Sequence, residues 1–389
     1  MRIAIVAPPW FEVPPRAYGG IESVCYELVR GLVARGHDVT LIGAGRKHSD
    51  ARFIATYAVP PSGLGEPGAT IHELIHAAKA TRAIETIEPD LVHDHSVAGP
   101  LGSRRRPWPT VVTVHGPVGV NEAELYRSLA PEVSLVALSR SQRGQAPNLR
   151  WAGVVHNGIR VSEYPFVDRK DQYLLFLGRM SPDKGPDLAI DVARTVGLPL
   201  VIAAKCTEPE ERAYFEEEIR PRLGSGVDWF GEADGNEKKR LLAGARCLLS
   251  PLRWDEPFGL VLIEAMACGT PVVALRRGSV PEIVVEGVTG FIRDRPHELP
   301  EAVWRTGTID PLACRTHVER HFTVDHMVNG YERIYSQVRA QAFGEALRSP
   351  DPVTGSDPSA RSRPQPSLRS PSSVARRLGK QETSPGRSA

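Results

Sequence analysis

The chain has 389 residues, of which 41% are hydrophobic and 24% are charged, and its formal net charge is +2. This length accommodates two domains of ordinary size, and the composition is that of a soluble globular enzyme. The small net charge gives no reason to expect a nucleic-acid partner, and no apolar stretch approaches the roughly 20 residues that span a bilayer. The apolar run Ile3–Ala7 stops at Pro8 and Pro9, too early for a signal peptide. We therefore expect a cytoplasmic protein, with peripheral contact at the inner face of the membrane as an open option.

Cysteine and histidine spacing gives no metal site. The five cysteines are odd in number and lack Cys-x-x-Cys spacing, which predicts reduced thiols. The group His93-Asp94-His95 follows a short apolar run and could suggest a metal. Because side chains alternate between the two faces of a strand, we expect this group to be split between faces. No third ligand has suitable spacing, so the sequence predicts no bound metal.

The first half of the chain alternates strands and helices. A strand over Arg2–Ala7 leads into a Pro-rich loop, a helix follows from Ile21 to about Gly36, and a second strand covers Val39–Ile42. This βαβ unit predicts a parallel sheet with flanking helices. Further short strands are predicted at residues 91–93, 111–115, 135–138 and 154–155, separated by turn-rich segments.

A break at residues 158–170 separates this array from a second one. Strands are predicted at residues 173–177, 200–204, 227–230, 247–250 and 271–274, with helices between them. Two consecutive arrays predict an α/β protein with two Rossmann-like domains facing a cleft, residues 1–160 and 170–325. A helix within residues 326–343 can return to the first domain. Residues 344–389 are rich in Pro, Ser and Arg and are predicted to be a disordered tail. Its basic residues either touch anionic partners or are solvated: Arg361, Arg363, Arg376, Arg377 and Lys380.

The segment EPFGLVLIE, from Glu256 to Glu264, carries the most information. Glu256 stands just before a predicted helix start, and Glu264 lies about two turns inside that helix. The backbone N–H groups of Phe258 and Gly259 can open toward a phosphate, because a helix N-terminus carries unpaired donors and roughly half a positive charge. A carboxylate repels phosphate, so we expect both glutamates to face neutral donors such as sugar hydroxyls. The segment therefore predicts both halves of a nucleotide-sugar site.

The segment GRMSPDKG, from Gly178 to Gly185, begins where the first strand of the second array ends. Ligands of open parallel sheets bind outside such strand ends. Arg179 offers a forked cation and Lys184 a compact one, and both kinds neutralise phosphates. If a diphosphate leaves without a metal, these cations must stabilise it, each contributing about 3 kcal/mol. The alternative is a surface turn with unpaired charges.

Three further positions stand at predicted loop or strand ends. Gly19-Gly20 opens the first helix, where the lack of side chains lets backbone N–H groups approach an anion, although such a pair is more often only a turn. His115 follows a strand, and the next two residues turn it toward the cleft. Asn157 ends the last strand of the first array, where a hinge can coexist with a polar contact to a sugar.

Other segments leave two interpretations open. Glu282 either contacts the ribose or base region of a nucleotide or caps a short helix. The base itself is expected near residues 229–232, through backbone groups and stacking. The run Arg104-Arg105-Arg106 beside Trp108 either meets an anionic membrane or a lipid-linked acceptor, or is a solvated charge run.

On these residues the chain resembles the retaining glycosyltransferases of family 4, which have the GT-B architecture. The likeness covers about residues 1–338. The family's Glu-x7-Glu pattern matches Glu256 and Glu264, and its Gly-Arg…Lys-Gly pattern matches Gly178, Arg179, Lys184 and Gly185. Its Gly-Gly loop matches Gly19 and Gly20, and its strand-end histidine matches His115.

This resemblance implies a role for each matched residue. Glu264 would bind the nucleotide ribose, Glu256 would lie beside the donor sugar, and His115 would contact that sugar near the reaction centre. The amides of Phe258, Gly259 and Leu260 would meet sugar and phosphate, while Arg179 and Lys184 would hold the diphosphate. Such enzymes need no bound metal or other cofactor.

The reaction expected from the resemblance is transfer of a hexosyl group from a nucleotide-diphosphate sugar to a sugar, lipid-linked or small-metabolite acceptor. Retention by double displacement requires a carboxylate nucleophile close to the anomeric carbon, and neither glutamate suits that role if both bind hydroxyls. A front-face reaction needs only positioning and stabilisation of the leaving group. Two alternatives stay open: a nucleotide-sugar epimerase of the same fold, which needs acid and base groups around the sugar, and a non-catalytic nucleotide-sugar binder.

Overall fold

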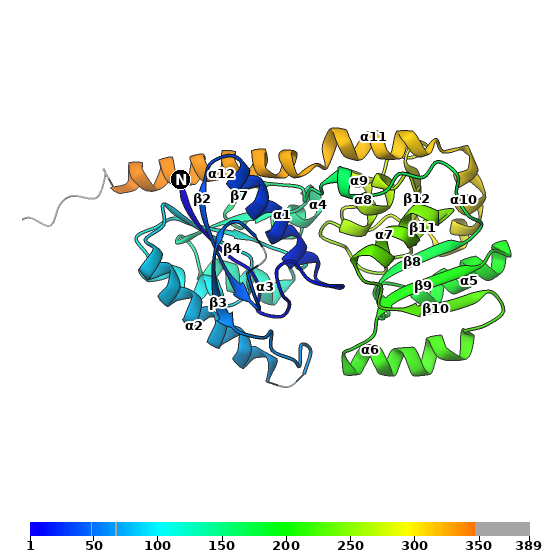
Figure 1. The fold of residues 1–389 in the computed structure, drawn as a ribbon, viewed down its shortest axis with the longest axis horizontal. Coiled ribbons are helices and arrows are strands. Elements are labelled where there is room, and N and C mark those ends of the chain that lie inside the picture. Colours follow the sequence, from blue (N-terminus) through cyan, green and yellow to red (C-terminus); the bar gives the residue numbers. More distant parts are fainter. Residues whose placement is uncertain (48, 67, 347–389) are drawn as a thin grey trace, which may run out of the picture. The chain divides into compact units, whose positions relative to one another are not determined.

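The computed structural model describes residues 1–47, 49–66 and 68–346, and its fold is shown in Figure 1. The first half forms a seven-stranded sheet with the order β3-β2-β1-β4-β5-β6-β7. Its strands are β1 (Arg2–Val6), β2 (Asp38–Ala44), β3 (Arg52–Tyr57), β4 (Leu91–Asp94), β5 (Thr110–Thr113), β6 (Val133–Ala137) and β7 (Trp151–Val154). Each neighbouring pair is parallel, which confirms the predicted sheet class.

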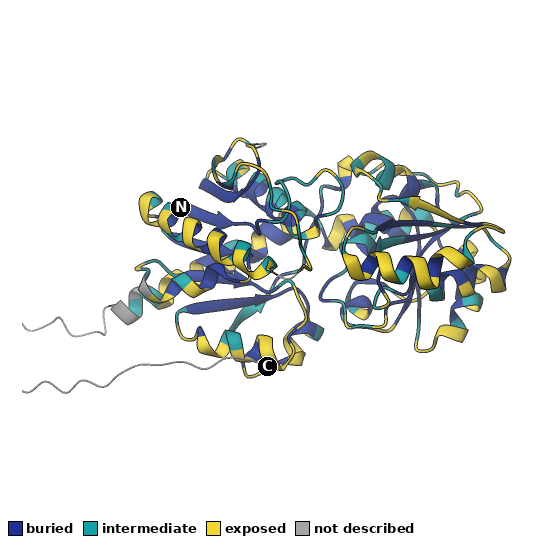
Figure 2. Cartoon of the chain, turned by 90° about the horizontal axis from the view of Figure 1, so that it is seen from below, coloured by how far each residue is buried: buried dark blue, intermediate teal, exposed yellow. Residues whose placement is uncertain are grey.

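The second half forms a six-stranded parallel sheet with the order β10-β9-β8-β11-β12-β13. Its strands are β8 (Leu174–Arg179), β9 (Leu200–Lys205), β10 (Val227–Gly231), β11 (Cys247–Ser250), β12 (Val272–Leu275) and β13 (Gly290–Arg293). The strands of both sheets are largely buried, and the helices turn exposed faces outward (Figure 2). Two doubly wound parallel sheets are therefore present, as predicted.

Helices cover these sheets. In the first half they are α1 (Gly20–Ala34), α2 (Ala69–Ile87), α3 (Val120–Ser128) and α4 (Arg140–Gln145). In the second half they are α5 (Pro186–Val196), α6 (Pro209–Tyr214), α7 (Gly235–Gly244), α8 (Leu260–Ala267), α9 (Val280–Ile283), α10 (Leu299–Arg305) and α11 (Pro311–His321). The chain then continues into α12 (Val324–Ala346), and short 3-10 or π turns occur at residues 99–105, 161–163, 215–222, 296–298 and 306–308.

Several elements were missed by the sequence patterns, each for a physical reason. Helix α2 is rich in alanine and buries only His76, Ala77, Ala80 and Ile84, so its apolar stripe is weak. Strand β3 lies at a sheet edge and is only partly buried, so it lacks a continuous apolar run. Strand β13 follows a turn at residues 287–289 and is only four residues long, too short for a clear apolar pattern.

Helix α12 packs on the first sheet rather than on the second. Val324, Val328, Tyr331 and Tyr335 belong to one buried cluster with residues of β1 and α1. The chain passes from the first half to the second near Ile159 and returns just before α12. The two passages are hydrogen-bonded to each other, because Ile159 N–H donates to Phe322 O at 2.9 Å and Ile159 O accepts from Val324 N at 3.2 Å. In Figure 1 the orange α12 runs beside α1 and β7. The domain boundaries at residues 160 and 170 stay predictions, since residues 1–346 form one compact unit.

The predicted tail falls almost wholly beyond the structure. Helix α12 extends through residue 346, so residues 344–346 are helical and not part of a disordered tail. The five basic tail positions named above lie outside the described residues. Within the described part of the chain, no helix combines the length and apolar composition that crossing a bilayer requires.

The contact between α1 and α12 generates a prediction for Gly31. A Cβ added at Gly31 would lie 2.6 Å from Val328 Cγ2 and 3.0 Å from Val324 Cγ1. We expect Gly31→Ala to lower the free energy of unfolding by about 1–3 kcal/mol, because α12 must move to admit the methyl group. Chemical denaturation of both proteins measures this difference.

Gly144→Ala is the matched control for this prediction. Gly144 lies in α4, is exposed, and would place its Cβ more than 4 Å from any neighbour. Because alanine favours helix over glycine, this control should be neutral or stabilising by up to about 1 kcal/mol. A Gly31→Ala protein as stable as this control would contradict the described packing of α12 on α1.

Candidate active site

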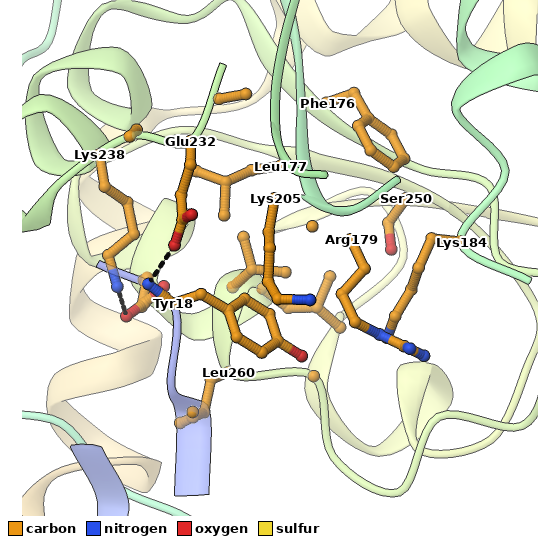
Figure 3. A pocket seen from close by; sticks show the side chains of 18 of the residues that line it. Tyr18, Phe176, Leu177, Arg179, Lys184, Lys205, Glu232, Lys238, Ser250 and Leu260 are labelled. Carbon is orange, nitrogen blue, oxygen red and sulfur yellow. Dashed lines mark hydrogen bonds and ion pairs between the residues drawn. The ribbon is translucent and has the colours of Figure 1, made fainter. Parts of the chain in front are cut away.

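A cavity lies at the carboxyl ends of the strands of the second sheet, and we call it the α8 cavity. Strand ends supply Gly178, Arg179, Lys205 and Ser250, and the loop before α1 closes one side with Tyr18, Gly19 and Gly20. The other lining residues are Ala17, Ser23, Phe176, Leu177, Lys184, Ala203, Glu232, Ala233, Lys238, Leu249, Leu252, Glu256, Gly259, Leu260, Val261, Leu262 and Glu264. Figure 3 shows the side chains of Arg179, Lys184 and Lys205 around this space. The residues predicted from two distant motifs therefore line one cavity.

A second cavity, the α1 cavity, adjoins the first and shares Tyr18, Gly19, Gly20, Arg179, Lys184, Glu256, Gly259 and Leu260 with it. It adds three predicted residues, His115, Asn157 and Phe258. Its remaining lining residues are Pro8, Trp10, Phe11, Ile21, Glu22, Val24, Leu64, Gly65, Leu138, Glu208, Trp254 and Pro257. The sequence therefore identified all twelve positions on one continuous surface, although their proposed ligand contacts stay predictions.

Backbone geometry fixes the loop that carries Glu256. Gly259 precedes α8 with φ of 79°, a left-handed conformation that favours glycine. Ser279 N donates to Glu256 O at 3.0 Å, and Ser279 Oγ donates to Phe258 O at 2.7 Å. Phe258 itself is 2% exposed, so its ring anchors the loop in the core. The turn at Gly278-Ser279 thus holds the α8 N-terminus in place.

Each motif glutamate contacts a lysine. Glu256 pairs with Lys184, and Glu264 accepts from Lys238 Nζ at 2.6 Å and from Tyr164 OH at 2.9 Å. The expectation that both glutamates face only neutral donors is therefore wrong. The physical reason is that a partly buried carboxylate needs a nearby cation or several hydrogen bonds to offset its lost hydration.

The other two cations of the α8 cavity are paired in the same way. Arg179 Nη2 lies 3.2 Å from Asp183 Oδ2. Lys205, 4% exposed, contacts Glu208 Oε1 at 2.7 Å and Glu211 Oε2 at 2.8 Å. Four cations thus surround one cavity, each held by at least one carboxylate.

Sequence reasoning missed Lys205, Lys238 and Tyr18. Lys205 ends β9 directly beside Arg179 at the end of β8, so the strand-end rule could have found it. Lys238 lies on α7, distant in sequence from the motifs, and no local signal marks it. Tyr18 donates its backbone N–H to Glu232 Oε1 at 2.9 Å (Figure 3), and burial raises the pKa of its phenol to about 12.

His115 is held by a second histidine. Its Nε2 lies 2.8 Å from His95 Nδ1, and burial lowers the pKa of His115 to about 3, so the ring is neutral at physiological pH. The ring centroids of His93 and His95 are 4.1 Å apart, so these two histidines lie on one face. Residues two apart on a strand share a face, and only Asp94 lies on the other. Among the described residues, no three His, Cys, Asp or Glu side chains are arranged to hold a metal.

His93 connects the histidines at the strand ends, His95 and His115, to helix α12. His93 Nδ1 contacts Tyr335 OH at 2.7 Å, and His93 Nε2 contacts Thr113 Oγ1 at 2.8 Å. Thr113 Oγ1 in turn contacts Tyr331 OH at 2.9 Å. These contacts satisfy buried polar groups and connect the crossover helix to the histidines at the strand ends.

The structure locates Glu282 and Trp229, whose roles the sequence left open. Glu282 lines neither cavity; it accepts from the backbone N–H groups of Arg140 and Ser141 at 2.9 and 2.8 Å and so caps α4, not its own helix. Trp229 packs on Phe215 with ring centroids 4.1 Å apart and does not line the α8 cavity, whereas Glu232 does. Trp229 is therefore not placed to stack on the nucleotide base, as the prediction for residues 229–232 required.

The basic run lies away from both cavities. Arg104, Arg106 and Trp108 border a separate hollow with Ser134 and Arg150. This hollow lies beside the residues where β5 and β6 begin, at the amino ends of the strands. Its contact with a membrane or a lipid-linked acceptor stays a prediction.

Comparisons with known proteins agree with this geometry. The protein-family model described as "Glycosyltransferase Family 4" matches residues 18–163 of the sequence, and the family model described as "Glycosyl transferases group 1" matches residues 163–304. A glycogen synthase of Mycobacterium tuberculosis is 28% identical, covering 75% of this chain and 81% of the relative. A D-inositol 3-phosphate glycosyltransferase of Mycolicibacterium smegmatis is 26% identical, covering 85% and 90%.

A solved structure supports the same assignment. AviGT4, a glycosyltransferase involved in avilamycin A biosynthesis, is 26% identical with a TM-score of 0.69, covering 87% of this chain and 98% of that protein. Together the two family models cover residues 18–304, which hold every strand except β1 and most of the cavity lining. The chain belongs to the family 4 glycosyltransferases, with the two-sheet GT-B fold.

Proposed function

We propose that this protein transfers a sugar from a nucleotide-diphosphate donor to an acceptor hydroxyl with retention of configuration. The observation that carries the proposal is the cluster of four cations that line the α8 cavity. Such a cluster suits a ligand that brings several negative charges, because unpaired N–H groups and cations converge on one point. The charge that a divalent cation supplies elsewhere would come from Arg179 and Lys184, so the proposal requires no metal.

Binding of the donor would exchange ion-pair partners. Lys184 and Arg179 would leave Glu256 and Asp183 for diphosphate oxygens, and Glu256 would then accept hydrogen bonds from the donor sugar. Glu264 would bind the ribose, where Lys238 now holds its carboxylate. His115, as a neutral ring, and Asn157, whose buried Oδ1 has no partner among the described residues, would contact the donor sugar. The amides of residues 258–260 and the Gly19-Gly20 loop would meet sugar and phosphate.

A front-face reaction is the mechanism that we propose. With the donor bound, Glu256 would accept hydrogen bonds from the sugar and Glu264 from the ribose, which makes either a poor nucleophile for double displacement. In a front-face reaction the departing phosphate oxygen accepts the acceptor's proton while the C–O bond to the acceptor forms on the same side. The protein then has to orient both substrates and stabilise the developing diphosphate charge, which the cation pair can do.

One observation favours a second candidate, a nucleotide-sugar epimerase. Glu22 supplies the α1 cavity with a carboxyl that sequence reasoning did not consider, and burial raises its pKa to about 8. A group titrating near neutrality can serve as an acid or base. Incubating the donor without any acceptor separates the two functions, because only an epimerase converts it to another nucleotide sugar.

The cytoplasmic location and peripheral membrane contact stay predictions.

Nucleotide binding is the first prediction of this proposal. We expect one of UDP, GDP and ADP, alone or as its sugar, to raise the Tm by several degrees, because a ligand bound to the folded state stabilises it by mass action. Glu264→Ala should weaken this effect at least tenfold in ligand concentration. A thermal-shift titration measures both, and an absence of any shift with all three nucleotides would count against the donor site.

Turnover is the second prediction. We expect Arg179→Ala and Lys184→Ala to lower kcat roughly 100-fold or more, because each removes a donor that stabilises the leaving diphosphate. Steady-state kinetics with the donor found above measures this. Lys239→Ala is the control, since Lys239 neighbours Lys238 on α7 but lines neither cavity. Normal kcat in either cavity variant, with the folded state verified by its Tm, would sink the leaving-group assignment.

A further inference from the structure

Aromatic side chains from the first half of the chain line one wall of the α1 cavity. Trp10, Phe11 and Tyr18 line it, together with Leu64. Trp10 is held in place, because its Nε1 donates to Glu73 Oε1 at 2.5 Å and its ring meets His72 edge-on at 6.1 Å. Phe11 and Tyr18 are likewise in edge-to-face contact at 5.9 Å. Fixed aromatic faces suit the apolar C–H face of a sugar ring.

The same wall carries no lysine or arginine among the described residues that line it. The cations that reach the α1 cavity, Arg179 and Lys184, come from the second half, and each is already paired with a carboxylate. The proposed function assigns both to the donor diphosphate. A phosphorylated acceptor would therefore lose its hydration without gaining a cation, which is unfavourable.

Glu22 is the acidic group of this wall, which also carries the polar side chains of His115 and Asn157. Glu22 is 3% exposed, and no side chain among the described residues donates a hydrogen bond to it; its own backbone N–H does. Burial, and in second place the nearby Glu73 carboxylate, raise its pKa to about 8. Tyr18 and Cys25 are the other titratable groups near it. A protonated carboxyl can both donate to and accept from hydroxyl groups.

We propose that Trp10, Phe11 and Glu22 form the acceptor subsite, and that this subsite takes an uncharged polyhydroxyl compound of the sugar class rather than a phosphorylated one. This inference rests on the proposed transferase function. It separates the chain from its inositol-phosphate-named relative, in spite of their 26% identity.

The protonation of Glu22 generates a stability prediction. Its folded-state pKa is raised above the ordinary value of 4.5, so the carboxyl opposes folding progressively as the pH rises from about 5 to about 8. We expect Glu22→Gln to gain Tm relative to the wild type over this window, by on the order of 2 °C or more at pH 8. The difference between the two proteins isolates Glu22, because both contain the same histidines. A pH-independent difference would contradict a buried neutral carboxyl.

The acceptor subsite is tested by matched acceptor pairs. With the donor identified by thermal shift, transfer to glucose and to myo-inositol is compared with transfer to glucose 6-phosphate and to inositol 3-phosphate. We expect kcat/KM to be at least tenfold higher for the uncharged member of each pair. Trp10→Ala should raise the KM for the acceptor about tenfold and leave donor binding unchanged, while Trp10→Phe should restore most of the loss.

Controls make each outcome decisive. Trp304→Ala, at an exposed tryptophan on α10, should change neither KM. Preference for the phosphorylated acceptors, use of no uncharged acceptor while the donor is bound, or an unchanged acceptor KM in Trp10→Ala would each overturn the inference alone. Failure to bind any nucleotide would instead sink the proposed function and this inference with it.

Discussion

The need to neutralise buried and partly buried cations governs this site. A lysine or arginine taken out of water without a partner costs several kcal/mol, so the four cations of the α8 cavity must each lie beside a carboxylate. Glu256 and Glu264 meet this need from two places, one before α8 and one inside it, and they reach lysines on different elements. The spacing of the two glutamates is therefore tied to the positions of Lys184 and Lys238. A ligand that replaces these partners with phosphate oxygens keeps the cations neutralised, so exchange costs less than it would at an empty charged site.

Parallel topology brings these groups together. The carboxyl ends of parallel strands meet at one edge of a sheet, so Arg179 and Lys205 arrive side by side from β8 and β9. The first sheet contributes its own edge through Tyr18, the Gly19-Gly20 turn and His115. Leu260 packs against the cores of both halves, and a Cβ at Gly20 would lie 3.4 Å from its Cδ1. A side chain larger than glycine would press on α8 where the helix meets both cavities.

The crossover helix supports the first sheet from behind the site. Tyr331 and Tyr335 of α12 satisfy Thr113 and His93, and the histidine pair beyond them ends at His115 in the α1 cavity. Burial keeps these rings neutral, so they can share hydrogen bonds without bringing a charge that needs its own partner. The second half of the chain thus contributes to both halves of the molecule: its sheet holds the cations, and its last helix orders the histidines of the other sheet.

The sequence alone determined the class of the fold and twelve of the residues that line the two cavities. Alternating apolar runs and helical periodicity predicted two parallel sheets, and strand-end and helix-start rules selected residues that line adjoining cavities, because local spacing encodes strand and helix ends. Only the tertiary structure decided which charged and polar side chains are partners. It paired Glu256 with Lys184 and Glu264 with Lys238, set Glu282 of α9 against the N-terminus of α4, put His95 beside His115, and revealed Glu22 and the aromatic wall. Those contacts join residues from separate elements, and a pattern read along one chain carries no signal for partners that become neighbours only when the sheets are assembled.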